Sequence, residues 1–401
     1  MKKHIILLST LTVLASATQA QIFTREDSLS AGLVGSNNAT VISGYGEVKY
    51  EYNSYTRTAS ANANRAVMFI GHRFNERYQL FSEWELENAN TKNGGEFGIE
   101  QLFIKYNINR NLYITTGLFT PRIGIINENH LPTTFNSINR PFVETLIIPA
   151  TWREIGVGLY GQSEQILGLN YAVSLTNGLD ASKFENGKGI RGGRGAGNTI
   201  NAKTIGITPS VLYYHNNFRI QASGYYGGSV GVSPREADSL FLETGPLGSA
   251  VAMAEANMQY KHKGVSVKAL VAYTNITKAQ DINRAYANNT PSEMIGGYAE
   301  LGYNVLHKKQ AVKSLTIFTR YEYLDLNSKV PVNGISTGTN KQQYIIAGVN
   351  FAPIRGVSFK AEYRLRTTEE PNPLLIVNPF PQQLAYPTSI NYVGIGMAYA
   401  F

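Results

Sequence analysis

The chain has 401 residues, of which only 16% are charged, and it contains 25 Tyr, 38 Gly and no Cys. Soluble globular chains carry about 25% charged residues, so the composition argues against that class, and the lack of cysteine excludes a disulfide framework or a lipid-anchored cysteine. The formal net charge of +8 comes without a basic stripe or a nucleic-acid reader motif, so we expect no nucleic-acid partner.

The first twenty residues have the pattern of a secretory signal peptide. Lys2 and Lys3 give a positive start, residues 5–14 form a short apolar run, and small residues follow. The run is too short to cross a membrane as a helix. We expect cleavage after Ala20 and a short periplasmic N-terminal segment over residues 21–40.

From residue 41 onward, apolar and polar residues alternate with a period of two, most clearly in residues 357–366. The alternating segments are longer than the ~5–6 residues of ordinary strands and close to the ~9–11 residues of a tilted membrane strand. The predicted strands are 41–52, 65–74, 79–88, 96–107, 112–120, 152–161, 166–177, 204–214, 218–230, 251–261, 264–275, 293–304, 314–325, 342–352, 357–367 and 390–401.

The connections that follow even-numbered strands differ in length from those that follow odd-numbered strands. Those after even-numbered strands are short, such as 75–78, whereas those after odd-numbered strands are mostly long, such as 53–64, 121–151 and 178–203. Short periplasmic turns alternating with long outer loops distinguish a bacterial barrel from a soluble sandwich. We therefore predict an all-β protein: a transmembrane antiparallel β-barrel of about 16 strands over residues 41–401, in the bacterial outer membrane and in contact with its lipid and lipopolysaccharide. Pro209 interrupts the eighth strand and indicates a bulge or kink.

The second face of the predicted strands is polar and charged, which favours a water-filled lumen because about 16 strands enclose one. The charges are segregated along the chain into an acidic arc in the early strands and a basic arc in the late ones, which we expect to oppose each other across the lumen. The predicted lumen-wall residues are Glu47, Glu83, Glu85, Glu87, Arg320, Lys360, Arg364 and Arg366.

The last predicted strand ends in Phe401, with Tyr399 two residues before it and Gly396 upstream. This pattern resembles the C-terminal signal by which the outer-membrane barrel-assembly machinery recognises its clients. We expect these three residues to act as an assembly signal, which makes that machinery a partner of the chain.

Among barrels, the chain resembles the phosphate-selective porin O/P-like group in its Bacteroidetes-type version. The resemblance covers residues 41–401 in architecture and is most specific over residues 117–154. It implies that the long loop 121–151 folds into the barrel and narrows it, and the apolar content of the loop agrees with a packed position. The charged residues predicted to line this constriction are Arg122, Glu128, Arg140, Glu144 and Arg153.

We therefore expect a porin, a channel for passive diffusion of small hydrophilic or anionic solutes, with a weak anion preference because the loops carry an excess of Lys and Arg. The architecture is compatible with a homotrimer. The histidines lack metal-ligand spacing, so neither a metal nor a cofactor is expected.

Two alternatives remain: a barrel enzyme, and a barrel whose surface loops bind a partner or mediate adhesion. Residues 227–231 match GxSxG and residues 187–192 match GxGxxG, but neither has the strand and helix that these motifs require. The strip Glu83, Glu85 and Glu87 resembles a glycosidase or calcium site, and is more simply part of a lumen wall. We expect no enzymatic activity.

Overall fold

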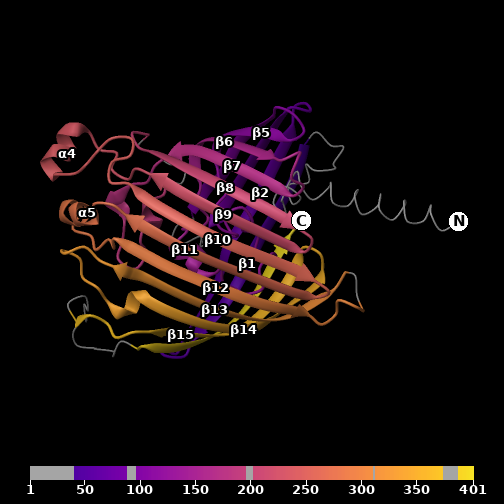
Figure 1. The fold of residues 1–401 in the computed structure, drawn as a ribbon. Helices are drawn as coiled ribbons and strands as arrows, with labels where there is room; N and C mark the ends of the chain where they lie inside the picture. Colours follow the sequence, from indigo (N-terminus) through magenta and orange to yellow (C-terminus); the bar gives the residue numbers. More distant parts are fainter. Residues whose placement is uncertain (1–39, 88–95, 196–201, 310–311, 374–386) are drawn as a thin grey trace.

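The computed structural model describes residues 40–87, 96–195, 202–309, 312–373 and 387–401. The chain forms a closed antiparallel barrel of 16 strands in sequence order (Figure 1). The strands are β1 Thr40–Asn53, β2 Thr58–Arg73, β3 Tyr78–Glu87, β4 Glu96–Asn107, β5 Leu112–Phe119, β6 Glu154–Gln162, β7 Leu169–Asn177, β8 Ile205–His215, β9 Phe218–Gly227, β10 Val251–His262, β11 Val265–Ile276, β12 Glu293–Asn304, β13 Ser314–Lys329, β14 Lys341–Ile354, β15 Val357–Thr368 and β16 Ser389–Ala400. The helices are α3 Phe142–Leu146, α4 Pro234–Leu240 and α5 Ala279–Tyr286, with short 3-10 turns η1 Ala181–Lys183, η2 Arg191–Gly193 and η3 Gly338–Asn340.

The alternation of residue types produces the two faces of the wall. In β7, Tyr171, Val173 and Leu175 are exposed on the outside, whereas the intervening Ser174 and Thr176 are buried on the inside. Successive side chains of a strand point to opposite faces, so an alternating sequence gives an apolar exterior and a polar interior. Within the described ranges, no helix is long and apolar enough to cross a membrane.

The barrel closes through the first and last strands. β1 pairs with β16 from Tyr45 opposite Ala400 to Asn53 opposite Tyr392. Closure gives every strand two neighbours, which is necessary where lipid offers no hydrogen-bond partner to the backbone. The prediction of a 16-stranded antiparallel barrel is confirmed, whereas the predicted signal peptide and most of the segment 21–40 lie outside the described residues.

The connections sort by length to the two ends of the barrel. Figure 1 shows α4 and α5 in the long connections at one end, and the C-terminus at the other end among the short turns. The predicted long connection 53–64 is an exception and is wrong, because β2 already begins at Thr58 and pairs with β1 up to Asn53. Residues 58–63 alternate small and polar types, so their strand carries no hydrophobic signal.

Pro209 sits at a gap in the ladder. β8 pairs with β7 without interruption, including Pro209 opposite Val173. The pairing with β9 skips from Ile207 to Ser210. Because proline has no N–H to donate, the missing rungs fall where the residue cannot make them.

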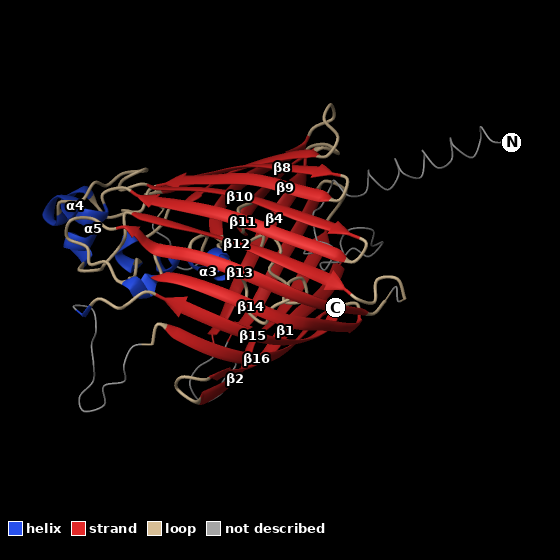
Figure 2. Cartoon of the chain, turned by 60° about the horizontal axis from the view of Figure 1, so that its bottom comes forward, coloured by secondary structure: helices blue, strands red, loops and turns tan. Residues whose placement is uncertain are grey.

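The segment 120–153, here called the in-folded loop, lies inside the barrel. Figure 2 shows its helix α3 within the ring of strands. Apolar residues of the loop, including Val143, Ile147 and Trp152, form a core with wall residues such as Tyr298 and Phe318. The predicted in-folding is therefore confirmed, and the packing explains how a long apolar connection avoids water.

Candidate pore constriction

Two glutamates of the wall hold the in-folded loop by its backbone. Glu322 of β13 accepts hydrogen bonds from the N–H groups of Phe142 and Val143 at 2.6 and 3.2 Å, at the start of α3. Glu362 of β15 accepts one from the N–H of Ile138 at 2.8 Å. A buried backbone donor without a partner costs about 1–3 kcal/mol, so these carboxylates stabilise the inserted position of the loop.

Two basic side chains satisfy the carbonyl groups of the same segment. Lys360 Nζ donates to the carbonyl oxygens of Pro132 and Ser137 at 2.6 and 3.0 Å. Arg320 Nη2 donates to the carbonyl oxygen of Asn139 at 3.3 Å. Both side chains are buried. The charged inner faces of β13 and β15 therefore form a docking surface for residues 132–143.

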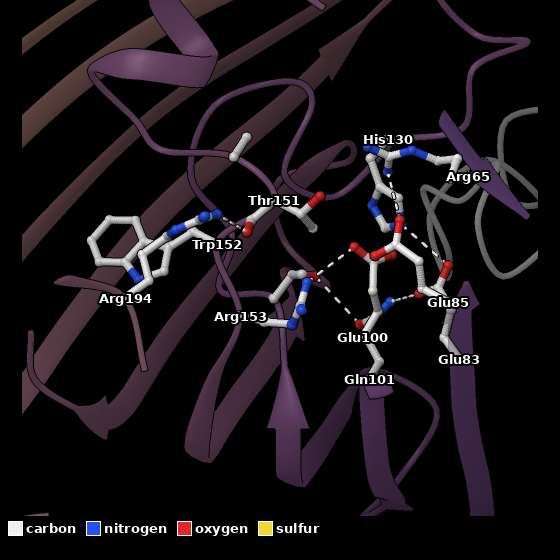
Figure 3. A network of polar contacts seen from close by, with 12 residues as sticks. Arg65, Glu83, Glu85, Glu100, Gln101, His130, Thr151, Trp152, Arg153 and Arg194 are labelled. Carbon is white, nitrogen blue, oxygen red and sulfur yellow. Dashed lines mark hydrogen bonds and ion pairs between the residues drawn. The ribbon is translucent and has the colours of Figure 1, made fainter. Parts of the chain in front are cut away.

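His130 anchors the in-folded loop to β3 and β4, two strands from the N-terminal part of the chain (Figure 3). Its Nε2 lies 3.2 Å from Glu83 Oε1 of β3 and 3.5 Å from Glu100 Oε2 of β4. The Tyr45 hydroxyl donates to both carboxylates. Burial opposes a charged imidazole, but the two carboxylates outweigh it and raise the pKa of His130 to about 10. His130 is therefore an imidazolium at neutral pH.

This cluster is also the only group in the described part of the chain with the side chains to hold a metal ion. The ligand atoms of Glu83, Glu100 and His130 lie within 4.8 Å of one another. A metal-bound histidine almost always donates its second ring N–H, whereas His130 Nδ1 has no hydrogen-bond partner. Arg153 Nη1 lies 3.1 Å from Glu100 Oε1, so with protonated His130 the two carboxylates are already neutralised. The geometry fits a protonated histidine better than a metal.

Three arginines have only neutral hydrogen-bond partners: Arg140 within the in-folded loop, and Arg191 and Arg194 beside it. Arg191 Nη1 donates to the carbonyl oxygens of Thr145 and Ala150 at 2.7 and 2.8 Å. Arg194 and Arg140 likewise bond to main-chain carbonyls and to a threonine hydroxyl. In the part of the chain that the structure describes, no carboxylate forms an ion pair with any of the three. Their positive charges are therefore not paired directly with a carboxylate where the two loops meet, although Glu87, Glu100 and Glu154 act on them from farther away.

The electrostatic environment of Arg194 reflects this crowding of positive charge. Burial, followed by the charges of Arg191 and Arg153, lowers the pKa of Arg194 to about 9, against the opposing attraction of the Glu154 carboxylate. Figure 3 shows the Arg194 side chain directed at Thr151, with Arg153 two residues along the same segment as Thr151. The region is half-buried, so charges here act in a medium that screens them less than bulk water.

Three of the five residues predicted for the constriction are half-buried: Glu128, Arg140 and Arg153. Glu128 lies between two basic groups, 2.7 Å from Arg122 Nε and 3.4 Å from Arg219 Nη2. Arg122 is buried. The predicted set is therefore divided between two places. Arg140 and Arg153 lie near Arg191 and Arg194, whereas Arg122 and Glu128 lie beside β9.

Glu144 does not face a passage, contrary to the prediction. It is fully buried, and its carboxylate accepts the N–H groups of Ile125 and Ile126 at 2.8 and 2.6 Å. The Tyr298 hydroxyl donates to its other oxygen at 2.6 Å. Glu144 therefore stabilises the fold of the loop from inside, because its carboxylate accepts hydrogen bonds from two buried backbone N–H groups of the same loop.

The in-folded loop packs against a large part of the inner wall and hydrogen-bonds to it. The polarity of an inward residue therefore does not imply that this residue contacts water. The predicted lumen-wall residues that are buried are Glu47, Glu83, Glu85, Arg320, Lys360 and Arg364, and those that are half-buried are Glu87 and Arg366.

The two predicted arcs of charge do not oppose each other. Because β16 pairs with β1, only one strand separates β15 from β1. Arg364 Nη2 lies 2.9 Å from Glu51 Oε2, and Arg65 reaches both Glu47 and Glu85 at 3.5 and 3.4 Å. The charges pair locally around the seam, so the prediction that the acidic and basic arcs oppose each other across the lumen is wrong.

The C-terminal residues close the barrel. Phe401 N–H donates to the Gly44 carbonyl at 2.9 Å, and the Phe401 carbonyl accepts from Gly44 N–H at 3.2 Å. Phe401 is 74% exposed on the outer face, which Tyr399 shares. Gly396 lies instead on the inner face, beside Ile138 of the in-folded loop.

Arg191 and Arg194 were considered from the sequence only as charges that could draw anions to the channel mouth, and they were not among the residues predicted for the constriction. Both lie in the glycine-rich connection 178–204, where solvated charge is the default interpretation. Gly187 and Gly189 adopt positive φ angles of 75° and 56° and allow the tight turn before η2. Apart from the hydrogen bond of Arg194 Nε to the Arg191 carbonyl, the partners of these arginines lie more than forty positions away, so only the folded chain brings them together.

Comparison with known proteins agrees with this architecture. The family model for phosphate-selective porin O and P matches residues 38–401. The chain belongs to the phosphate-selective porin O and P family. It is therefore an outer-membrane porin, a channel for small solutes, and the sequence-based prediction of family and function is confirmed.

An uncharacterized protein of Aquifex aeolicus is 26% identical to the porin over 338 residues, which cover 80% of this chain and 74% of that protein. The porin also resembles solved structures in fold. The anion-selective porin from Comamonas acidovorans has a TM-score of 0.54 at 11% identity, covering 90% of this chain and 99% of that one. The trimer form of OmpT from Vibrio cholerae has a TM-score of 0.53 at 12% identity, with coverage of 91% and 100%. The channel DcaP of Acinetobacter baumannii has a TM-score of 0.52 at 12% identity, with coverage of 91% and 99%.

Proposed function

We propose that this porin passes small anions in preference to cations, and that its selective region is the junction of the in-folded loop with the connection 178–204. The observation that carries the proposal is that Arg140, Arg191 and Arg194 have neutral partners while most charges on the wall are paired. Charged side chains at a constriction decide which ions pass. A positive region without directly paired carboxylates lowers the energy of an anion there and raises that of a cation.

The similarity to a family described as phosphate-selective supports inorganic phosphate as one of the solutes. The similar fold of a porin named as anion-selective agrees with the sign of the preference. The guanidinium group suits an oxyanion because its planar donors match the oxygen geometry. Hydrogen bonds to neutral carbonyls orient these guanidinium groups without cancelling their charge.

The channel is proposed to work by diffusion and without catalysis. Ser229, the serine of the GxSxG match, is buried in a connection after β9, and its hydroxyl donates to the Ser249 carbonyl at 2.7 Å. A nucleophilic serine instead needs an exposed position on a strand-to-helix turn beside a base. This hydroxyl has a structural hydrogen bond.

The test is the reversal potential of the purified porin in a planar bilayer across a potassium chloride gradient. We expect anion selectivity in the wild type and a shift toward cations in the triple variant Arg140→Gln, Arg191→Gln, Arg194→Gln. Arg110→Gln, in the exposed turn between β4 and β5, is the matched control and leaves the potential unchanged. Cation selectivity of the wild type, or a triple variant identical to it, contradicts the proposal.

Export and assembly belong to the same proposal. The leader is removed after Ala20, the barrel-assembly machinery inserts the chain among outer-membrane lipid and lipopolysaccharide, and three copies associate as a homotrimer. The trimer form of the similar OmpT fold supports the last point. The mass of the N-terminal peptide and the mass of the detergent-purified complex test the cleavage site and the number of copies.

A further inference from the structure

The inner face of β16 carries a groove one strand wide. Three consecutive inward positions are small: Gly394, Gly396 and Ala398. Both neighbouring strands place long charged side chains beside the two glycines. Glu362 of β15 and Glu51 of β1 flank Gly394, whereas Lys360 and Lys49 flank Gly396. The groove therefore has charged walls and a floor of bare backbone.

The side chain of Ile138 occupies this groove. A Cβ atom added to Gly394 would lie 2.2 Å from Ile138 Cδ1, and one added to Gly396 would lie 3.1 Å from Ile138 Cγ2. Ile138 is buried. Real Cβ atoms do not approach other carbons to 2.2 Å, so even a methyl group at Gly394 requires the isoleucine to move.

Ile138 has little freedom to turn away from the groove. Its own N–H donates to Glu362, and the preceding carbonyl, of Ser137, accepts from Lys360. These are the two residues directly opposite Gly394 and Gly396 in the β15–β16 register. The charged wall fixes the backbone while the glycine floor receives the side chain, so the two features specify one position together.

A second contact of the same kind lies on the far side of α3. A Cβ atom added to Gly296 of β12 would lie 2.7 Å from Ile147 Cδ1. Residues 138 and 147 flank the helix, so the loop rests on the wall through two isoleucines, each placed over a glycine. Glycine weakens a strand by about 0.5–1 kcal/mol relative to alanine, and here it permits close approach of another segment.

We propose that Gly394 and Gly396 are positioning residues that set how closely the in-folded loop lies against the wall, and thereby the width of the channel. The inference deepens the proposed function, since it assigns the channel's width to particular wall positions. It also gives Gly396 a role separate from the assembly signal, because its contact is with the lumen side of the barrel.

The first test is single-channel conductance of Gly394→Ala. We expect the added methyl to push Ile138 and the loop toward the barrel axis and to lower unit conductance by about twofold, as overpacking displaces a well-packed segment. Gly98→Ala is the matched control, because a Cβ atom at Gly98 meets nothing within 4 Å. The double variant Gly394→Ala with Ile138→Ala restores conductance toward the wild-type value, which a general defect of β16 would not allow.

A second readout is independent of conductance. The porin has no cysteine, so Ser137→Cys gives a single buried thiol beside Ile138. A water-soluble thiol reagent should label it slowly in the Gly98→Ala background, faster in Gly394→Ala, and slowly again in the double variant. A wild-type porin that conducts no ions contradicts the proposed function, whereas this labelling still tests the position of the loop.

If Gly394→Ala does not assemble, Ile138→Phe provides the test, because it enlarges the same contact from the loop side and leaves the wall intact. We expect lower conductance and faster labelling than in the Gly98→Ala control. Unchanged conductance with slow labelling in Gly394→Ala or Ile138→Phe, or a double variant no closer to wild type than Gly394→Ala, would overturn the proposal.

Discussion

His130 shows how a single side chain ties the loop to the wall by charge. The residue is buried with its imidazolium between two glutamates. Removing one partner of such a buried ion pair is strongly destabilising, because the other charge is left without compensation. Sequence could not identify this cluster, because Glu83, Glu100 and His130 are far apart and follow no ligand spacing. It could identify Glu83 as an inward residue, because alternation fixes the face of each strand residue.

The charge of His130 predicts a pH dependence. Its folded pKa of about 10 lies above the ordinary 6.5, so its stabilising contribution is complete below about pH 6.5 and is lost as the pH rises through about 10. We expect the loop to loosen between pH 9 and about 11, seen as increased labelling of the Ser137→Cys thiol relative to a small-molecule thiol at each pH.

His130→Gln should label faster at pH 8 and rise less between pH 8 and 11 than the parent. His307→Gln, in the connection after β12, is the control for titration of groups elsewhere and should follow the parent. Identical pH profiles for His130→Gln and the parent would show that the imidazolium does not hold the loop.

At the scale of elements, the strands were predictable and their environment was not. The alternation that locates β13 and β15 also places Arg320 and Lys360 on the inner face, as the structure shows. Alternation cannot say whether that face meets water or another segment. The loop that covers it is long and carries its own apolar residues, and these features, with the family resemblance, were the signals of insertion in the sequence.

The inserted loop predicts a gain in conductance when its middle is removed. Replacing residues 130–143 with a short Gly-Ser linker removes the contacts to β3, β4, β13 and β15. The pairing of β5 with β6 involves none of these residues, so the barrel should still close. We expect a several-fold larger unit conductance in bilayers, because the wall then borders water.

The control for this variant is heat-modifiable gel mobility, which shows that the barrel is folded. A linker of matched composition replacing residues 235–240 of α4, in another outer connection, should leave conductance near the wild-type value. A folded deletion variant with unchanged conductance would mean that residues 130–143 do not limit the passage.

At the scale of the whole molecule, closure of the barrel makes the first and last strands of the chain neighbours. Strand order along the chain was predictable from segment and connection lengths, and the neighbours of each strand follow from it except at one place, the seam between β16 and β1. There β16 joins β1, so residues from opposite ends of the chain, such as Glu51 and Arg364, become partners. These charges are far apart in the sequence, and for that reason the acidic and basic arcs were predicted to lie on opposite sides of the lumen.

Phe401 lies at the same seam, at the end of the last strand. Its backbone forms two hydrogen bonds with Gly44, and a Cβ atom added to Gly44 would lie 3.1 Å from its ring. Phe401→Ala keeps the backbone hydrogen bonds and removes the ring, whereas deletion of Phe401 removes both. If the ring is an assembly signal, both variants lower the amount of folded porin in the outer membrane, and the assembled fraction conducts normally because the ring is outside the lumen.

Phe359→Ala, which removes an outward phenylalanine from β15, is the control and leaves the amount unchanged. A lower amount only in the deletion variant would assign the effect to the seam, and normal amounts with altered conductance would contradict both roles.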